Sequence, residues 1–260
     1  MDLRACMRLK KRVRENMTTS IYQHIIQAKI EGQKLLAVLI DPDKIDISYI
    51  PQFLQKVHTS IITHIFVGGS TDAEKKMEIV VKTIKQHTTL PILIFPGSHE
   101  QITEAADGIL FLSLLSGRNP KYLIEQQVQS VEKLIGTNLE IIPTGYILID
   151  GGVETAVQRV SETKPISQNN KETILHTALA GQFSGKQLIY LEAGSGATKM
   201  VHEKIVQEVA RNLKIPLIVG GGIRSKTQLE TAFNAGADLV VIGTAFEENE
   251  DFFFELRSFK

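Results

Sequence analysis

Short apolar runs recur along the chain, and each ends in turn-forming residues before a segment with helical periodicity. The runs are almost continuously apolar rather than alternating, which is typical of strands buried on both faces of a parallel sheet. The pattern predicts eight such strands, at residues 35–40, 64–67, 91–95, 108–112, 140–142, 188–191, 216–219 and 239–242.

Amphipathic segments separate these runs and predict helices at residues 72–85, 121–135, 172–183, 198–213 and 225–235. One more helix is expected before the first strand, beginning after Thr18, Thr19 and Ser20 and ending at Gly32. Eight strands alternating with helices over 260 residues predict a (β/α)₈ TIM barrel, a parallel eight-stranded barrel with an N-terminal helix. A doubly wound open sheet is the alternative, but no Gly-x-Gly-x-x-Gly motif follows the first strand.

The interval between the fifth and sixth strands, residues 143–186, is the least regular. Residues 145–152 are interpreted as an extended excursion and residues 161–171 as a polar surface loop. Insertions that follow barrel strands lie on the catalytic face, so this interval is expected near the site.

Composition and charge narrow the class of protein. The chain is 43% hydrophobic with a formal net charge of +0, which gives no reason to expect nucleic acid as a partner. Its single cysteine, Cys6, excludes an internal disulfide. Neither a membrane-spanning run nor a signal peptide is found, so a cytoplasmic location is expected.

Residues 1–16 differ from the rest because they are rich in Arg and Lys and have no clear apolar stripe. A disordered basic extension is favoured here, and a contact with nucleic acid or anionic lipid is the alternative. Residues 17–260 are expected to form one TIM-barrel domain.

The sixth run delivers the most informative side chains. Strand residues alternate between faces, so Leu188, Tyr190 and Glu192 share one side. Glu192 stands on an otherwise apolar strand just before Gly194-Ser195-Gly196, where packing does not require a carboxylate. The position of Glu192 in this sequence therefore predicts a chemical role for its carboxylate.

The seventh and eighth runs end in glycine turns that open helices, Gly220-Gly221-Gly222 and Gly243-Thr244. Barrels often bind a phosphate between these two loops through glycine N–H groups and helix N-termini. The alternative is that glycine merely ends each strand.

The first and second strands build the other half of the barrel mouth. Asp41 shares the interior-facing side with Ala37 and Leu39, and Ser70 and Thr71 follow the second strand. Magnesium takes one or two protein oxygens beside substrate phosphates, so Asp41 with a Ser70 or Thr71 hydroxyl suits a Mg²⁺–diphosphate. Helix capping is the alternative reading for this stretch. Another loop residue, Arg118, is either an anion contact or part of a solvated loop.

Together these strings resemble the geranylgeranylglyceryl phosphate synthase family over about residues 35–254. The resemblance is carried by Leu39-Ile40-Asp41-Pro42-Asp43-Lys44, Val67-Gly68-Gly69-Ser70-Thr71, Tyr190-Leu191-Glu192-Ala193-Gly194-Ser195-Gly196, Val219-Gly220-Gly221-Gly222-Ile223-Arg224 and Gly243-Thr244. It implies a Mg²⁺-dependent prenyltransferase that joins sn-glycerol 1-phosphate to a long prenyl diphosphate through an ether bond, and usually a homo-oligomer.

The resemblance also implies residue roles. Glycerol phosphate would be bound by Tyr190, Leu191, Glu192, Ala193, Gly194, Ser195, Gly196, Gly221, Gly222, Gly243 and Thr244. Asp41 and Ser70 would hold the magnesium, and Glu192 would take the hydroxyl proton as general base. Leu39 stands where relatives with longer donors have lysine, which favours geranylgeranyl diphosphate.

Two other functions remain open from the sequence. One is a phosphate-binding isomerase or lyase of the type found in amino-acid biosynthesis, which shares the glycine turns. The other is a barrel that binds a phosphometabolite without turnover.

Overall fold

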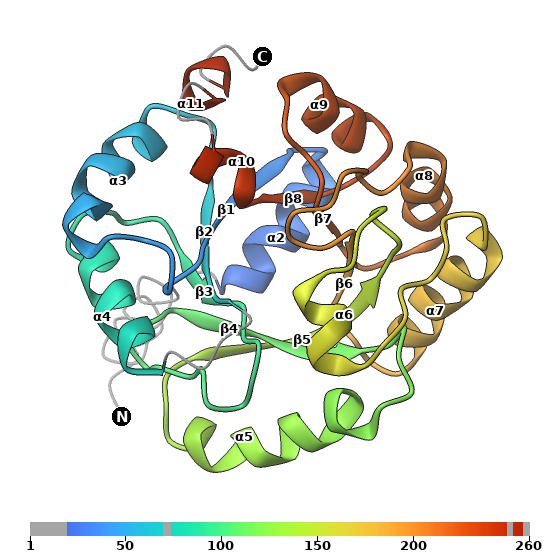
Figure 1. Cartoon of the computed structure of the whole chain (residues 1–260), viewed down its shortest axis with the longest axis horizontal. Helices are drawn as coiled ribbons and strands as arrows, with labels where there is room; N and C mark the ends of the chain where they lie inside the picture. The colour runs from blue at the N-terminus through green and yellow to red at the C-terminus, as the bar shows by residue number, and fades with distance from the viewer. Residues whose placement is uncertain (1–19, 70–73, 249–251, 257–260) are drawn as a thin grey trace, which may run out of the picture.

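Eight parallel strands close into a barrel in the computed structural model, and helices surround it (Figure 1). The structure describes residues 20–69, 74–248 and 252–256. The strands are β1 (Leu35–Ile40), β2 (His64–Val67), β3 (Ile92–Ile94), β4 (Gly108–Leu114), β5 (Glu140–Leu148), β6 (Leu188–Glu192), β7 (Leu217–Gly220) and β8 (Leu239–Ile242). Pairing of β1 with β8, in the register Leu35 with Leu239, closes the barrel and confirms the predicted fold.

Helices follow most strands on the outside of the barrel. They are α2 (Ile21–Glu31), α3 (Ile50–His58), α4 (Glu74–Lys85), α5 (Gln126–Leu134), α6 (Ala156–Ser161), α7 (Lys171–Phe183), α8 (Glu203–Asn212), α9 (Lys226–Asn234), α10 (Thr244–Glu248) and α11 (Phe252–Glu255), with a 3₁₀ turn η1 (Ile47–Tyr49) and a π-helical turn η2 (Lys121–Glu125).

Side-chain alternation along the strands divides the core into two layers. Phe66, Leu110 and Tyr190 pack inside the barrel. Their neighbours Ile65 and Leu191 pack outside, beneath the helices. Strands buried on both faces explain why the runs are continuously apolar.

One end of the barrel is closed by α2, which lies across the barrel centre in Figure 1. Ile25 and Ala28 of α2 pack into the inner layer. The helix begins where Ser20 Oγ accepts from Gln23 N at 3.1 Å, and it ends at Gly32 with φ of 70°, as predicted. The Lys29 ammonium and the Asp238 carboxylate, 2.9 Å apart, tie α2 to the start of β8.

The predicted excursion at residues 145–152 is wrong in its first half, because β5 continues to Leu148. The fifth strand, predicted to end at residue 142, runs through Pro143, whose missing N–H does not stop the pairing and whose carbonyl accepts from Gln187 N at 2.7 Å. The extension brings Tyr146 opposite Tyr190 on β6.

Several helix boundaries also differ from the prediction. The segment 121–135 divides into η2 and α5, and α8 starts at Glu203 because the His202 ring caps it by accepting from Lys204 N at 3.1 Å. The short helices α6, α10 and α11 have too few residues to show helical periodicity in the sequence. Within the described ranges, no helix is both long and apolar enough to cross a bilayer.

Candidate active site

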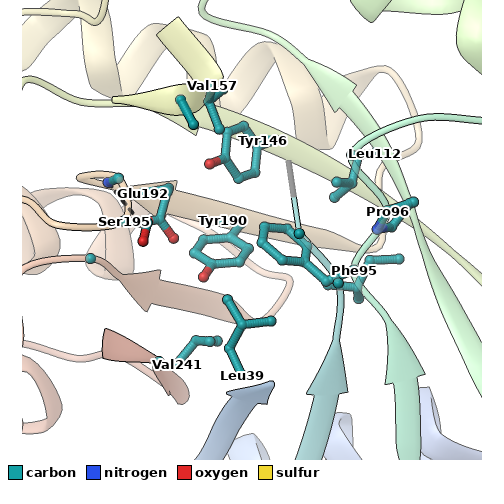
Figure 2. A pocket seen from close by; sticks show the side chains of 18 of the residues that line it. Leu39, Phe95, Pro96, Leu112, Tyr146, Val157, Tyr190, Glu192, Ser195 and Val241 are labelled. Carbon is teal, nitrogen blue, oxygen red and sulfur yellow. Dashed lines mark hydrogen bonds between the residues drawn. The ribbon is translucent and has the colours of Figure 1, made fainter. Parts of the chain in front are cut away.

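A cavity of about 470 Å³ opens at the carboxyl ends of the strands, where loops from both halves of the barrel meet. Figure 2 shows Tyr190 and Glu192 between Tyr146, Phe95, Leu39 and Ser195. This is the end opposite the α2 cap, and it is the face on which TIM barrels place their chemistry.

Glu192 is the last residue of β6 and only 6% exposed, yet its carboxylate lines the cavity. Its Oε1 accepts a hydrogen bond of 2.6 Å from Gly194 N, which fixes the carboxylate against the turn that follows the strand. The Tyr190 hydroxyl lies beside it but has no hydrogen-bond partner of good geometry among the described residues. A buried carboxylate next to a buried hydroxyl that lacks a well-formed hydrogen bond is suited to receive a polar ligand.

Burial raises the pKa of Glu192 above its ordinary value, while the neighbouring Tyr190 hydroxyl and the Gly194 N–H act in the opposite direction. Burial also raises the pKa of Tyr190, and the Glu192 charge adds to that effect. Tyr190 therefore stays protonated, whereas Glu192, once ionised, is a stronger base than a glutamate in water.

Four glycines with positive φ lie in the turns after β6 and β7, and two of them, Gly194 and Gly221, adjoin the Glu192 carboxylate. Gly194, Gly196, Gly221 and Gly222 have φ of 98°, 76°, 78° and 71°. A Cβ on Gly221 would lie 2.4 Å from Glu192 Oε1. Among the described residues, the N–H groups of Gly196, Gly221 and Gly222 donate to no protein acceptor. The turns thus form a concave surface of backbone donors that suits an anion.

Thr244 completes this half of the mouth. Its Oγ1 lies 3.4 Å from Ser195 Oγ, so the loops after β6 and β8 meet beside the glycine turns. Both side chains are open to the cavity. The three loops predicted to bind phosphate are therefore brought together.

Replacing Gly221 with alanine should raise KM for a phosphorylated substrate at least about tenfold, since an L-residue in the left-handed region costs about 1–2 kcal/mol and the new methyl group meets Glu192. Steady-state kinetics checks this. Gly185→Ala is the matched control, because Gly185 has φ of 84° with nothing within 4 Å of the added Cβ. An equal rise in KM in both variants would contradict an anion cradle at Gly221.

The other half of the mouth contains Asp41, which follows β1 and lines the cavity. Asp43 N donates to Asp41 Oδ1 at 3.0 Å, and Lys44 Nζ lies 3.6 Å from Oδ2. A Cβ on Gly69 would come within 2.6 Å of Oδ1, so the turn after β2 lies directly against this carboxylate. The ends of the first and second strands therefore lie next to each other at Asp41, as the sequence predicts.

The protein oxygens near Asp41 fit a magnesium site only if substrate phosphate oxygens complete the coordination. Nowhere in the described part of the chain do three or more acidic, histidine or cysteine side chains gather at metal-binding distance. Asp41 offers one carboxylate with its side chain still 18% exposed, and Mg²⁺ commonly uses one or two carboxylates plus phosphate oxygens and water. Ser70 and Thr71, the predicted hydroxyl ligands, lie outside the described residues.

An apolar wall extends from the polar groups toward β3 and β4. Phe95 stacks on Tyr190 with ring centroids 5.5 Å apart, and Tyr146 packs against both rings at 5.9 and 5.4 Å. Leu112 and Val157 continue this wall (Figure 2). An apolar chain can lie along this surface.

Some predicted residues do not reach the cavity with their side chains. Leu191 and Ala193 belong to the outer core, so they contribute backbone only. Arg118 is exposed and donates to the carbonyls of Leu115 and Gly117 in its own loop, which favours the solvated-loop reading. Leu39 does line the cavity.

Sequence reasoning missed the aromatic wall. The usable signal for Tyr146 was the two-residue period of Ile142, Tyr146 and Leu148, which all pack inside the barrel. Phe95 had no such signal, because an aromatic residue at a strand end is equally expected in a core.

A closed barrel with glycine turns, a buried carboxylate and an apolar wall at its carboxyl-end mouth has the features of TIM-barrel enzymes that bind phosphorylated substrates. The comparisons with known proteins narrow this class. A model of the PcrB family matches residues 28–258, and the chain belongs to that family.

Curated relatives cover almost the whole chain. The geranylgeranylglyceryl phosphate synthase of Zunongwangia profunda is 60% identical over 230 residues, which are 88% of this chain and 98% of that protein. The enzyme of the same name from Flavobacterium johnsoniae is 54% identical over 239 residues, covering 92% and 98%. The chain is accordingly an enzyme of the prenyltransferase class.

A solved structure agrees with the fold throughout. The crystal structure of (S)-3-O-geranylgeranylglyceryl phosphate synthase from Thermoplasma acidophilum in complex with its substrate sn-glycerol-1-phosphate superposes with a TM-score of 0.87 at 34% identity. The match covers 92% of this chain and 96% of that one.

Proposed function

We propose that this chain forms the ether bond between sn-glycerol 1-phosphate and geranylgeranyl diphosphate and releases diphosphate. The observation that carries the proposal is the position of the buried Glu192 carboxylate, between the glycine turns and the aromatic wall of one cavity. That arrangement suits a reaction with one phosphorylated polar substrate and one apolar substrate. Relatives and the neighbouring structure bear names of the same activity.

Each substrate would occupy a separate half of the cavity. The phosphate of glycerol 1-phosphate would lie on the N–H groups of Gly196, Gly221 and Gly222, with the Ser195 and Thr244 hydroxyls beside it. This leaves the glycerol hydroxyls next to Glu192 and Tyr190.

The prenyl donor would lie opposite, with its chain along the aromatic wall and its diphosphate toward Asp41. Lys44 and Arg224 also line the mouth and add positive charge near the two phosphorylated groups. Leu39, with no charge of its own, borders the donor half.

The reaction needs a group that accepts the proton of the attacking glycerol hydroxyl. As the terminal hydroxyl oxygen of glycerol phosphate bonds to the first prenyl carbon, the bond from that carbon to the diphosphate oxygen breaks, and diphosphate leaves with the electron pair. Glu192 takes the hydroxyl proton. Because Gly194 N already holds Oε1, the carboxylate needs little reorganisation to receive it.

Magnesium would be held by Asp41 together with the diphosphate, where it would neutralise the charge of the leaving group. The Tyr190 hydroxyl orients the glycerol together with Glu192, since its ring is fixed by Phe95 and Tyr146 and the hydroxyl lies beside the carboxylate. Phe95 and Tyr146 also exclude water from the developing allylic cation.

Incubation with glycerol 1-phosphate, labelled geranylgeranyl diphosphate and Mg²⁺ tests the proposal, with the labelled ether as the expected product. An isomerase or lyase would leave the label in the diphosphate, and a non-catalytic barrel would bind glycerol phosphate without turnover. Family membership favours the prenyl transfer over both. Assembly into a homo-oligomer stays a prediction, which sedimentation analysis would measure.

The pH dependence follows from the Glu192 environment. A general base must be ionised, so activity should fall as pH decreases through the Glu192 pKa. Because burial raises this pKa, the acidic limb of kcat/KM should lie above the ordinary glutamate value of 4.5. A pH–rate profile checks this, and an acidic limb that persists in Glu192→Gln would assign it to another group.

A further inference from the structure

An apolar stripe is exposed on the outer face of η2 and α5. Ile124, Val128, Val131 and Ile135 are 57%, 65%, 44% and 75% exposed. Val128 and Val131, three residues apart, lie on one side of α5, while Ile124 precedes them in η2 and Ile135 follows directly after the end of α5. We call these four residues the α5 stripe. Ile141 at the start of β5, 42% exposed, lies after the end of α5 in the chain.

The α5 stripe is continuous with the wall of the cavity. On the inner face of the same segment, Tyr122 and Gln126 line the cavity. The Tyr122 hydroxyl donates to the Val160 carbonyl at 3.1 Å, and Val160 is both exposed and part of the cavity lining. The segment that carries the α5 stripe therefore also forms part of the cavity wall, and it meets α6 at the Tyr122–Val160 hydrogen bond.

We propose that the α5 stripe docks this enzyme on the surface of a lipid bilayer, beside the edge through which the prenyl chain enters and the product leaves. The proposal rests on the proposed function, because a twenty-carbon prenyl donor and its ether product partition into membranes. The outer face of this segment would contact the bilayer while its inner face lines the cavity. The prenyl chain would then cross only a short distance through water between the bilayer and the site.

The size of the α5 stripe favours a bilayer over a second copy of the chain. A face about 20 Å long and about 10 Å wide presents roughly 200 Å². A stable protein interface needs about 800 Å² from each partner, so this stripe alone is too small. Shallow insertion of one apolar helix face into the headgroup boundary has no such requirement.

Charge around the α5 stripe predicts which lipids are needed. Lys121 and Lys133 are balanced by Glu125 and Glu132 in the same segment. The contact should therefore depend on apolar insertion rather than on anionic headgroups, and it should persist at high salt.

Flotation of the full-length chain with neutral phosphatidylcholine vesicles tests the proposal. The Val128→Gln/Ile135→Gln double variant should bind vesicles at least about tenfold more weakly, since two apolar side chains no longer insert. Ile30→Gln/Ile79→Gln is the matched control, because Ile30 and Ile79 are 72% and 50% exposed on α2 and α4. It should bind as the wild type does, including at about 1 M salt, where the Debye length is about 3 Å.

Activity assays separate docking from chemistry. With the donor in vesicles the stripe variant should lose about tenfold in kcat/KM, and with the donor in detergent micelles it should match the wild type. If no variant transfers a prenyl group from either source while flotation behaves as expected, the proposed function fails and docking stands.

Three results would overturn the proposal. One is equal vesicle binding by wild type and stripe variant. Another is a concentration-dependent dimer in sedimentation that Val128→Gln/Ile135→Gln abolishes, which would assign the α5 stripe to a second copy. The third is wild-type binding that appears only after residues 1–16 are deleted, which would make that segment the occupant.

Discussion

Asp41→Ala is expected to abolish prenyl transfer at ordinary Mg²⁺ concentrations while leaving glycerol phosphate bound. Asp41 is the carboxylate at the end of β1 that lines the cavity, opposite the glycine turns, and the described residues offer no cluster of acids to replace it. Without an anionic anchor the metal and the diphosphate lose their fixed position, and the leaving group keeps its charge. Turnover as a function of Mg²⁺ concentration and calorimetric titration of glycerol phosphate measure the two effects.

Asp43→Ala is the matched control for this experiment. Asp43 is exposed and outside the cavity lining, and its backbone N–H, which donates to Asp41 Oδ1, survives the substitution. It should keep nearly normal Mg²⁺ dependence. If Asp41→Ala also keeps normal dependence, the metal is held by the diphosphate without this carboxylate.

The barrel could be predicted from the sequence because its signal is repeated and redundant. Eight apolar runs each identify a strand independently, so errors at single boundaries, such as the fifth strand predicted to end at residue 142, do not change the architecture. Strand ends are harder to predict because pairing partners decide where a ladder stops. β5 continues to Leu148 because β4 and β6 both extend beside it.

The polar half of the site could also be predicted, because its residues differ from the apolar strand residues around them. Glu192 is an acid on a buried strand, and Gly221 is a glycine whose positive φ and lack of a side chain are both required. The apolar half could not be predicted. Phe95, Leu112 and Tyr146 have the composition of a core, and only their three-dimensional arrangement leaves a cavity between them.

Glu192→Gln is expected to lower kcat by about 10²–10⁴-fold, the range for loss of a positioned general base. Glutamine keeps the size of the side chain, and its amide oxygen can still accept from Gly194 N, so the turn that carries the glycine cradle should stay in place. The lost function is the capacity to accept the hydroxyl proton. Single-turnover kinetics with saturating glycerol phosphate measures this directly.

The binding constant of glycerol phosphate is the internal control, because the proposal places the phosphate on backbone N–H groups that the substitution does not alter. It should change only a few-fold, so the loss falls on kcat rather than on KM. A carboxylate that merely orients the glycerol makes the opposite prediction, since the glutamine oxygen orients the hydroxyl equally well. Near-normal turnover in Glu192→Gln would therefore remove the general-base role and leave proton transfer to solvent or to the departing diphosphate, with the glycine cradle still the binding site.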